Sequence, residues 1–194
     1  MTVATEEQDR EDMARLIAGH DGALDDLMGR HAERLYHYLL RALRNESEAA
    51  DLAEEAFVRI YEHRASFKPR SKFSTWLYTI ATNLARDMQR YRARHPQVSL
   101  DAVAGETGRD LKEVLPDAGP NPGQSLEAGE RAEAVRRAVA ALPEELRVPL
   151  VLAEYEEKSH DEIAQILDCS AKAVEMRIYR ARNQLRTQLQ AQMP

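Results

Sequence analysis

Residues 71–95, SKFSTWLYTIATNLARDMQRYRARH, combine an apolar face and a basic face in one continuous helical pattern. Leu77, Ala81, Leu84 and Met88 recur at helical spacing and therefore point to one side. The opposite side carries a contiguous polar and basic stripe, which consists of Thr79, Asn83, Arg86, Arg90 and Arg94. The stretch predicts a helix, beginning at Ser74 as its cap, that buries one side and presents arginines on the other.

Aromatic and cationic side chains alternate just upstream of this helix and in its first turn. They are Phe67, Lys68, Arg70, Lys72, Phe73, Trp76 and Tyr78. Aromatic rings can stack on unpaired bases while neighbouring cations contact the backbone, and an asparagine can hydrogen-bond a base edge. We therefore expect this face to lie on nucleic acid. The alternative interpretation is that Trp76 and Phe73 are core residues, and for Phe73 we favour the core.

Helical spacing dominates the rest of the chain, and no strand pattern persists. Residues 97–129 interrupt it with five glycines, three prolines and no sustained apolar period, which predicts an acidic, extended linker. The sequence thus predicts an all-α protein with two small helical domains, residues 1–96 and 130–194, joined by a flexible linker. Further predicted helices span residues 9–18, 22–44 with Asp21 as the N-cap, 48–63, 130–142 and 143–157, with Pro143 at the start of the last and Pro149 bending it.

The C-terminal domain contains the pattern of a helix-turn-helix. Ser159 and Glu162 form an S-x-x-E capping box for a helix ending near Leu167, and Ser170 can cap a second helix after a short turn. Asp168 occupies the turn position that needs a left-handed backbone, which Asp tolerates well. The second helix has an apolar back made of Val174, Ile178, Ala181 and Leu185.

The other side of this second helix carries side chains that could read base edges in the major groove. The predicted contacts to duplex DNA are Lys172, Ala173, Glu175, Met176, Arg177 and Arg180. Tyr179 and Asn183 share that side. The alternative interpretation is an ordinary amphipathic helix with a solvated charged face.

Charge is distributed unevenly along the 194 residues, although the formal net charge is only −6. Residues 1–63 carry 7 Lys/Arg against 15 Asp/Glu, or −8, whereas residues 64–97 carry 8 against 1, or +7. Residues 98–130 carry 2 against 7, or −5, and residues 131–194 carry 10 against 10. Such asymmetry suggests separate partners for separate segments. The acidic outer face of residues 48–62 is therefore either a solvated surface or a docking surface for a protein.

Four motifs in this order resemble the extracytoplasmic-function (ECF) sigma factors of bacterial RNA polymerase. They are DLAEEAFVRIY (51–61), FSTWLYTIATNLARD (73–87), LPEELRVPLVL (142–152) and HDEIAQILDCSAKAVEMRIYRARNQLR (160–186). The resemblance covers residues 10–192, nearly the whole chain. It implies a promoter-specificity subunit that binds core RNA polymerase through its N-terminal domain, melts and reads the −10 element there, and reads the −35 element as duplex with its C-terminal domain.

The resemblance also assigns roles to individual residues. Phe67, Trp76 and Asn83 would line a pocket for a flipped base. The full set expected at the −10 element is Phe67, Lys68, Arg70, Lys72, Trp76, Thr79, Asn83, Arg86 and Arg90. The set expected to bind polymerase is Asp51, Glu54, Glu55, Val58 and Tyr61. The linker would thread towards the polymerase active site, mimicking nucleic acid by charge, and a membrane-linked anti-sigma factor would hold the protein inactive.

The sequence departs from the family pattern at several positions. Glu54 stands where the family often has Gln, Asp168 and Cys169 replace a Gly-containing turn, and AKAVEMR replaces the commoner GTVKSR. The −35 sequence that this chain reads therefore does not transfer from the family. The chain ends soon after the helix-turn-helix, so we expect no further C-terminal regulatory domain.

Two other classes of protein compete with this interpretation. A helix-turn-helix regulator with a helical sensor domain would bind duplex DNA as the free protein and would have no use for the 73–87 face. An enzyme is disfavoured because the six histidines show no metal-ligand spacing and there is no Gly-rich phosphate loop. We expect no metal, cofactor or small-molecule substrate.

One cysteine excludes an internal disulfide, no apolar run could span a membrane, and no signal peptide is present, so the expected location is cytoplasmic.

Overall fold

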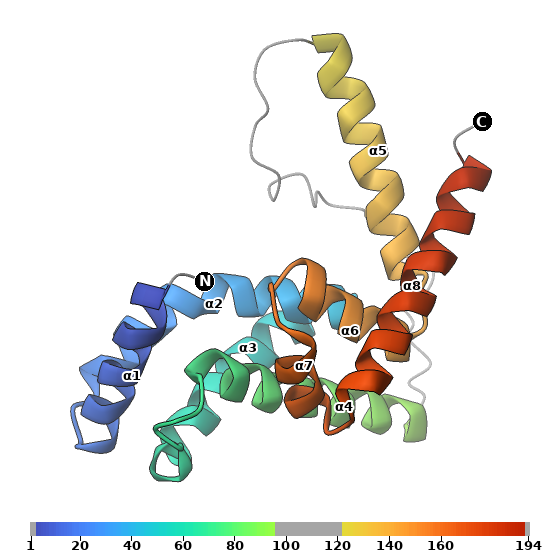
Figure 1. Ribbon diagram of the computed structural model, residues 1–194. Helices are drawn as coiled ribbons and strands as arrows, with labels where there is room; N and C mark the ends of the chain where they lie inside the picture. The colour runs from blue at the N-terminus through green and yellow to red at the C-terminus, as the bar shows by residue number, and fades with distance from the viewer. Residues whose placement is uncertain (1–2, 96–121, 193–194) are drawn as a thin grey trace.

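The computed structural model describes residues 3–95 and 122–192, and every regular element within these two ranges is a helix (Figure 1). The N-terminal half consists of α1 (Val3–Ile17), α2 (Gly22–Leu43), α3 (Glu46–Glu62), the short 3-10 helix η1 (Arg64–Ser66) and α4 (Phe73–Arg94). The C-terminal half consists of α5 (Pro122–Ala140), α6 (Glu144–Glu154), α7 (His160–Leu167) and α8 (Ala171–Gln192). The all-α prediction is confirmed. Residues 97–121 of the predicted linker lie outside the described residues.

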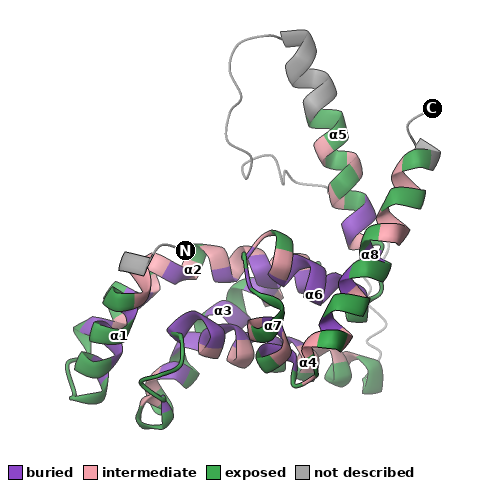
Figure 2. Ribbon diagram, viewed as in Figure 1, coloured by how far each residue is buried: buried purple, intermediate pink, exposed green. Residues whose placement is uncertain are grey.

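The core of the N-terminal half lies between α2, α3 and α4, which pack against one another. Each helix contributes its apolar stripe, as the helical spacing predicts, with Leu35, Ile60 and Leu77 fully buried (Figure 2). A buried hydrogen bond joins Tyr38 Oη and Thr82 Oγ1, which are 2.6 Å apart. Burial raises the pKa of the Tyr38 phenol, so this group stays neutral and the core carries no charge there.

Of two predicted helix caps in this half, Asp21 occupies the N-cap position of α2 as predicted, whereas the prediction of Ser74 as the cap of α4 is wrong. Asp21 makes no cap hydrogen bond to α2; its carboxylate accepts from the Tyr61 hydroxyl at 3.1 Å instead. Ser74 lies inside α4, which begins at Phe73, and its hydroxyl accepts a hydrogen bond from the Lys158 ammonium at 2.7 Å. Both side chains serve tertiary contacts, which local sequence rules cannot foresee. At the start of α3, Asn45 Oδ1 accepts from the Glu48 N–H at 3.0 Å.

The first helix of the C-terminal half overlaps the end of the predicted linker. Helix α5 starts at Pro122, so the last part of the predicted linker, residues 122–129, is helical. Proline suits the first turn of a helix because its missing N–H needs no partner there. Pro143 is the N-cap of α6, as expected, and Pro149 lies buried within that helix. The core of this half joins α6, α7 and α8 through residues such as Val151, Ile163 and Ile178.

The two halves lie against each other. Helix α7 packs on α4, and α6 packs on α2, whereas α5 packs along α8 and rises away from the other helices (Figure 1). The sequence predicts two separate domains but contains no signal for this contact. Its consequence is that α4, the predicted nucleic-acid helix, is covered on one side by its own half and on another side by α7.

Candidate nucleic-acid interface

The basic stripe of α4 lies on the side of the helix that faces away from the N-terminal core. Asn83 and Arg90 are exposed, and Thr79 and Arg86 are half-buried. Arg90 is 3.5 Å from Asp87, a neighbour on its own helix, so its guanidinium stays on the surface. The structure therefore brings together the polar residues that the sequence groups, and cations one turn apart on an exposed helix face can contact successive phosphates.

The aromatic residues near the start of α4 form a compact cluster. The ring centroids of Phe67 and Trp76 are 5.2 Å apart, and Phe73 lies 6.5 Å from each of them. Phe73 is buried, as favoured from the sequence, and Trp76 is half-buried. Phe67 is also buried, at 7% exposure, so in this structure its ring packs on Trp76 and is not open for stacking on a base.

The cations of the loop before α4 differ in their surroundings. Lys68 and Arg70 are exposed. The Lys72 ammonium is held between two carboxylates, 2.7 Å from Glu6 of α1 and 3.2 Å from Glu162 of α7. The hydrogen bond to Glu6 is the main cause that raises the pKa of Lys72, and the bond to Glu162 adds to it, against a lowering by burial. Lys72 is thus already paired with acidic groups on both sides.

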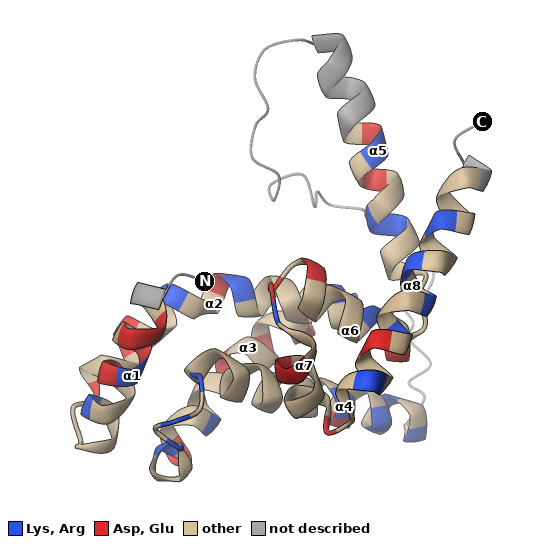
Figure 3. Ribbon diagram, in the orientation of Figure 1, with Lys and Arg blue, Asp and Glu red and all other residues tan. Residues whose placement is uncertain are grey.

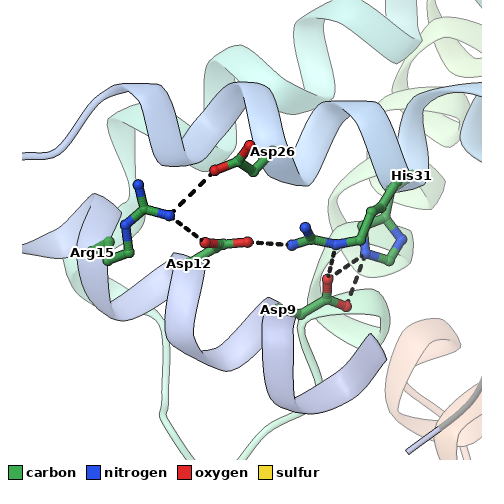
Figure 4. Close-up of polar contacts among 6 residues, drawn as sticks. Asp9, Asp12, Arg15, Asp26 and His31 are labelled. Atoms are coloured by element: carbon green, nitrogen blue, oxygen red, sulfur yellow. Dashed lines mark hydrogen bonds and ion pairs between the residues drawn. The ribbon is translucent and has the colours of Figure 1, made fainter. Parts of the chain in front are cut away.

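A buried ionic cluster behind the loop is a feature that the sequence did not reveal (Figure 4). Asp9 of α1 is 1% exposed and lies 2.8 Å from His31 Nε2 and 3.0 Å from Arg30 Nε, both on α2. Arg30 also donates to Asp12 at 2.5 Å. The His31 ring lies 5.1 Å from the Phe73 ring, so the cluster supports the first residue of α4. The only indication of this cluster in the sequence is that Asp9 and Asp12 lie three residues apart in α1. This spacing does not identify the residues of α2 that pair with them.

The helix-turn-helix of the C-terminal half has the predicted local chemistry. The Ser159 hydroxyl accepts from the Glu162 N–H at 3.3 Å, and the Glu162 carboxylate accepts from the Ser159 N–H at 2.8 Å, which completes the capping box. Asp168 has a φ of 51°, the left-handed conformation expected for the turn. Ser170 Oγ accepts from the Ala173 N–H at 3.2 Å and so begins α8.

Helix α8 buries Val174, Ile178 and Ala181 and leaves its other side open. Lys172, Glu175, Met176 and Arg180 are exposed, while Ala173 and Arg177 are half-buried at the edges of that side. Tyr179 is 61% exposed, the most open of the large apolar side chains among the described residues. Lys172 donates to Glu175 at 2.8 Å, which lowers the pKa of the Glu175 carboxyl.

The α8 face can therefore offer a cation, a carboxylate and apolar groups to a major groove. In Figure 3 the ribbon is coloured blue at further Lys and Arg positions along α8 and at the C-terminal end of α4. The Arg177 guanidinium lies 3.7 Å from Cys169 Sγ, which ties this edge of α8 to the turn.

The outer face of α3 forms a third surface. Asp51, Glu54 and Val58 are exposed, and Val58 is 49% open, which is unusual for an apolar side chain. Glu55 is half-buried and accepts from Arg59 Nε at 2.8 Å, and Tyr61 is half-buried beside Asp21. This surface combines acidic groups with an open apolar residue, a composition that suits a protein partner better than nucleic acid.

Neither a metal centre nor a membrane span is found in the described part of the chain. No group of three or more His, Cys, Asp or Glu side chains there is placed to hold a metal ion. No helix among residues 3–95 and 122–192 is long and apolar enough to cross a bilayer.

Two family models match the chain, one within each half. Sigma-70 region 2 matches residues 27–95, and Sigma-70, region 4 matches residues 132–185. The ECF RNA polymerase sigma factor SigW of Bacillus subtilis is 37% identical over 172 residues, which are 88% of this chain and 91% of that protein. The ECF RNA polymerase sigma-E factor of Escherichia coli K12 is 33% identical over 180 residues, 91% of each chain.

Solved structures show the same fold. CnrH in complex with the cytosolic domain of CnrY matches with a TM-score of 0.67 and 26% identity, covering 95% of this chain and 98% of that chain. RpoE of Bartonella quintana, a sigma factor in complex with the anti-sigma factor NepR, matches with a TM-score of 0.68 and 22% identity, covering 87% of this chain and 98% of that one.

Proposed function

The chain belongs to the extracytoplasmic-function sigma factors of the sigma-70 family and is a promoter-specificity subunit of RNA polymerase, and we propose that it works through three separate surfaces. The observation that carries this proposal is the pairing of two helices, α4 and α8. Each buries an apolar face in its own half and presents polar side chains flanked by arginines on another. The helix-turn-helix regulator is not favoured, because it leaves the α4 face without a role.

The α4 surface is proposed to take the −10 element as a melted strand. Asn83 has the donor and acceptor to bond a base edge, and Arg86 and Arg90 lie one turn apart for the backbone. Lys68, Arg70 and Lys72 would hold the strand before it reaches the helix. Phe67 and Trp76 are proposed to separate and bind a flipped base, which requires the Phe67 ring to leave its packed position on Trp76.

The α8 surface is proposed to read the −35 element in the major groove. Lys172, Glu175 and Met176 lie in the first two turns, where a recognition helix meets base edges. Arg177 and Arg180 flank them and would contact phosphates. The Lys172–Glu175 pair must separate for both side chains to contact bases, and since the pair is exposed, little energy opposes this.

The outer face of α3 is proposed to bind core RNA polymerase, through Asp51, Glu54, Glu55, Val58 and Tyr61. The work of the chain would then be binding and positioning, with bond formation left to the polymerase in the cytoplasm. The solved structures that match the fold include sigma factors bound to anti-sigma factors, and we propose a membrane-linked partner of that class for this chain.

The test is run-off transcription by purified core RNA polymerase from a duplex library randomised over the −35 and −10 regions. The account expects few transcripts without the chain and, with it, enrichment of two sequence motifs at promoter spacing. Omitting the polymerase should leave the free chain with no comparable selection of duplex DNA. Strong sequence-specific duplex binding by the free chain, without stimulation of transcription, would favour the helix-turn-helix regulator instead.

A further inference from the structure

Helix α1 contacts the part of the chain that contains the proposed pocket for a −10 base, although it carries none of the residues of the three proposed surfaces. It packs on α2, on the short helix η1 and on α4. Met13 and Leu16 of α1 are fully buried, so the helix is fixed to the N-terminal core by apolar contacts as well as by charges. A helix fixed in this way can position the elements that it contacts.

Two acidic residues of α1 reach the start of α4 by different routes. Glu6 Oε1 is 2.7 Å from Nζ of Lys72, the N-cap residue of α4. Asp9, one turn later, is 1% exposed, and its carboxylate lies 2.8 Å from Nε2 of His31, which is also buried (Figure 4). The His31 ring lies 5.1 Å from the ring of Phe73, the first residue of α4. Adjacent residues at the start of α4 are therefore held from α1.

Phe73 connects this buried pair to the two aromatic residues of the proposed pocket. Its ring centroid is 6.5 Å from that of Phe67 and 6.5 Å from that of Trp76. Phe73 is 3% exposed, whereas Trp76 is half-buried, so Phe73 can position the pocket but offers little surface to a base. A buried hydrogen bond to a carboxylate is strong and directional, so Asp9 fixes the orientation of the His31 ring against Phe73.

The loop between η1 and α4 is held at both ends and open in its middle. At one end η1 packs on α1, and at the other end Lys72 and Phe73 are held by the two contacts from α1. Residues 68–71 between these ends are exposed. A loop with fixed ends loses less conformational freedom when it binds a ligand, because part of the ordering has already taken place. The arrangement is therefore suited to hold a recognition loop ready for its target.

We propose that α1 is a positioning element for −10 recognition, in which Asp9 and His31 act through Phe73. Together they hold the Phe67–Trp76 pair in the geometry that receives a flipped base. This role deepens the proposed function of the α4 surface and rests on it. When a base enters, Phe67 leaves its position on Trp76, while Phe73 stays against His31 and keeps the Trp76 ring in place. Asp9 and His31 contact no base themselves, so they are positioning residues.

The first test needs no DNA, because Trp76 is the only tryptophan of the chain and its fluorescence reports on the pocket. His31→Gln keeps an N–H that can donate to Asp9 but removes the ring that contacts Phe73. In the full-length variant, the Trp76 emission should shift to longer wavelength, and acrylamide should quench it more strongly than in the wild type. Asp9→Ala should change both in the same direction. Unchanged emission and quenching in both variants would contradict the positioning.

The matched control is Asp12→Ala. Asp12 lies one turn from Asp9 and pairs with Arg30, as Asp9 does, but its second partner is Arg15 and not His31. Trp76 fluorescence in this variant should equal that of the wild type. Asp9→Asn, which keeps an oxygen that can accept from His31, should restore most of the wild-type signal. All variants are compared at a temperature at which circular dichroism shows wild-type helix content. If Asp12→Ala alters the Trp76 signal as much as Asp9→Ala does, the effect is a general loosening of α1, and the positioning role is wrong.

Base recognition is measured separately, with the polymerase complex bound to promoter duplexes whose −10 region is pre-melted. An abasic site is placed at each position of the melted strand in turn. At the position of the flipped base, the wild type should lose about tenfold in affinity, which lies within the range for a base stacked on an aromatic ring. In His31→Gln most of this factor should disappear, because the intact base is then bound little better than the abasic site. Affinity for core polymerase alone should be the same as in the wild type.

Failure of the positioning role and failure of the proposed function give different results. If the wild type loses affinity at one abasic position and His31→Gln loses the same factor there, the pocket exists, but α1 does not position it. If no abasic position weakens binding by the wild type, the proposed base pocket on α4 is wrong, and the positioning role falls with it.

Discussion

Helices α4 and α8 run over Phe73–Arg94 and Ala171–Gln192 and are proposed to read the two promoter elements, yet they are packed very differently. Helix α8 buries one face and leaves the other open, with Met176 and Tyr179 exposed. Helix α4 is enclosed on two sides, so that even Ser74, Thr75 and Thr82 are buried. The comparison teaches that two helices with the same amphipathic pattern can leave very different amounts of surface open. On α4 the open surface is the side that carries Asn83 and Arg90.

The largest expected effect concerns the support of α4. Asp9→Ala removes the buried carboxylate that pairs with His31 and Arg30, and losing one partner of a buried ionic contact should cost about 3 kcal/mol of unfolding free energy. Hydrogen exchange should quicken in α1 and at the start of α4, because the His31 ring packs on Phe73. Exchange in α8 should stay as in the wild type.

Its control is Asp26→Ala. The Arg15–Asp26 pair, at 3.2 Å, has both side chains about half exposed, so its loss should cost less than about 1 kcal/mol. Equal effects of the two substitutions would mean that the buried cluster does not support α4.

The next effect concerns the outer face of α3, whose acidic side chains Asp51 and Glu54 are exposed. Asp51→Lys combined with Glu54→Lys reverses the charge of the outer face of α3 without touching the core. Like charges placed across an interface oppose binding, so affinity for core polymerase should fall at least about tenfold, or about 1.4 kcal/mol. Glu11→Lys combined with Asp25→Lys, two equally exposed changes on α1 and α2, is the control for net charge. Equal polymerase affinity in a titration of folded variant and wild type would place the docking surface elsewhere.

A smaller effect tests the helix that links the two regions. Ser159→Ala removes the N-cap of α7, which supports α8 and also covers α4, and should lower stability by about 1 kcal/mol. Ser159→Asp, which keeps a capping oxygen, should recover most of that loss. Thermal denaturation measures both. If Ser159→Asp loses as much stability as Ser159→Ala, Ser159 stabilises the protein through an interaction other than the cap.

The smallest effect separates a phosphate contact from a base contact on α8. Arg180→Ala should weaken all promoters about equally and reduce the slope of log affinity against log salt by about one counterion. Arg182→Ala should reduce that slope less, because the Arg182 guanidinium already binds Glu154. The measurement is binding of the polymerase complex to duplex promoter over a range of salt. A change in base preference for Arg180→Ala would reassign it to base reading.

Much of this molecule follows from local rules. The helical spacing predicts the buried residues of α4 and α8, and the pattern S-x-x-E predicts the cap of α7, because these features depend on residues close in sequence. Asp168 in the left-handed conformation follows from the same kind of argument. The grouping of Thr79, Asn83, Arg86 and Arg90 on one helix face is likewise a matter of period alone.

What the sequence does not predict are contacts between distant residues. Ser74 is a residue type that often caps helices, but its hydroxyl accepts a hydrogen bond from Lys158 in the other half of the chain. From its place among cations, Phe67 is expected to be exposed and to stack on a base, but its ring packs on Trp76. Asp9 gives no sign of its buried partners on α2. In each case the deciding interaction lies across an interface whose geometry no periodicity encodes.

The most direct test of the account compares Asn83→Ala, Lys172→Ala and Glu175→Ala in transcription by core polymerase from a promoter library randomised over both elements. Removing a side chain that bonds a base should cost about 1–3 kcal/mol of discrimination at the position it reads. Asn83→Ala should alter the selected −10 sequence and leave the −35 sequence unchanged, and Lys172→Ala and Glu175→Ala should do the reverse. If all three variants select the wild-type sequences at both elements, neither helix reads bases and the central claim is wrong.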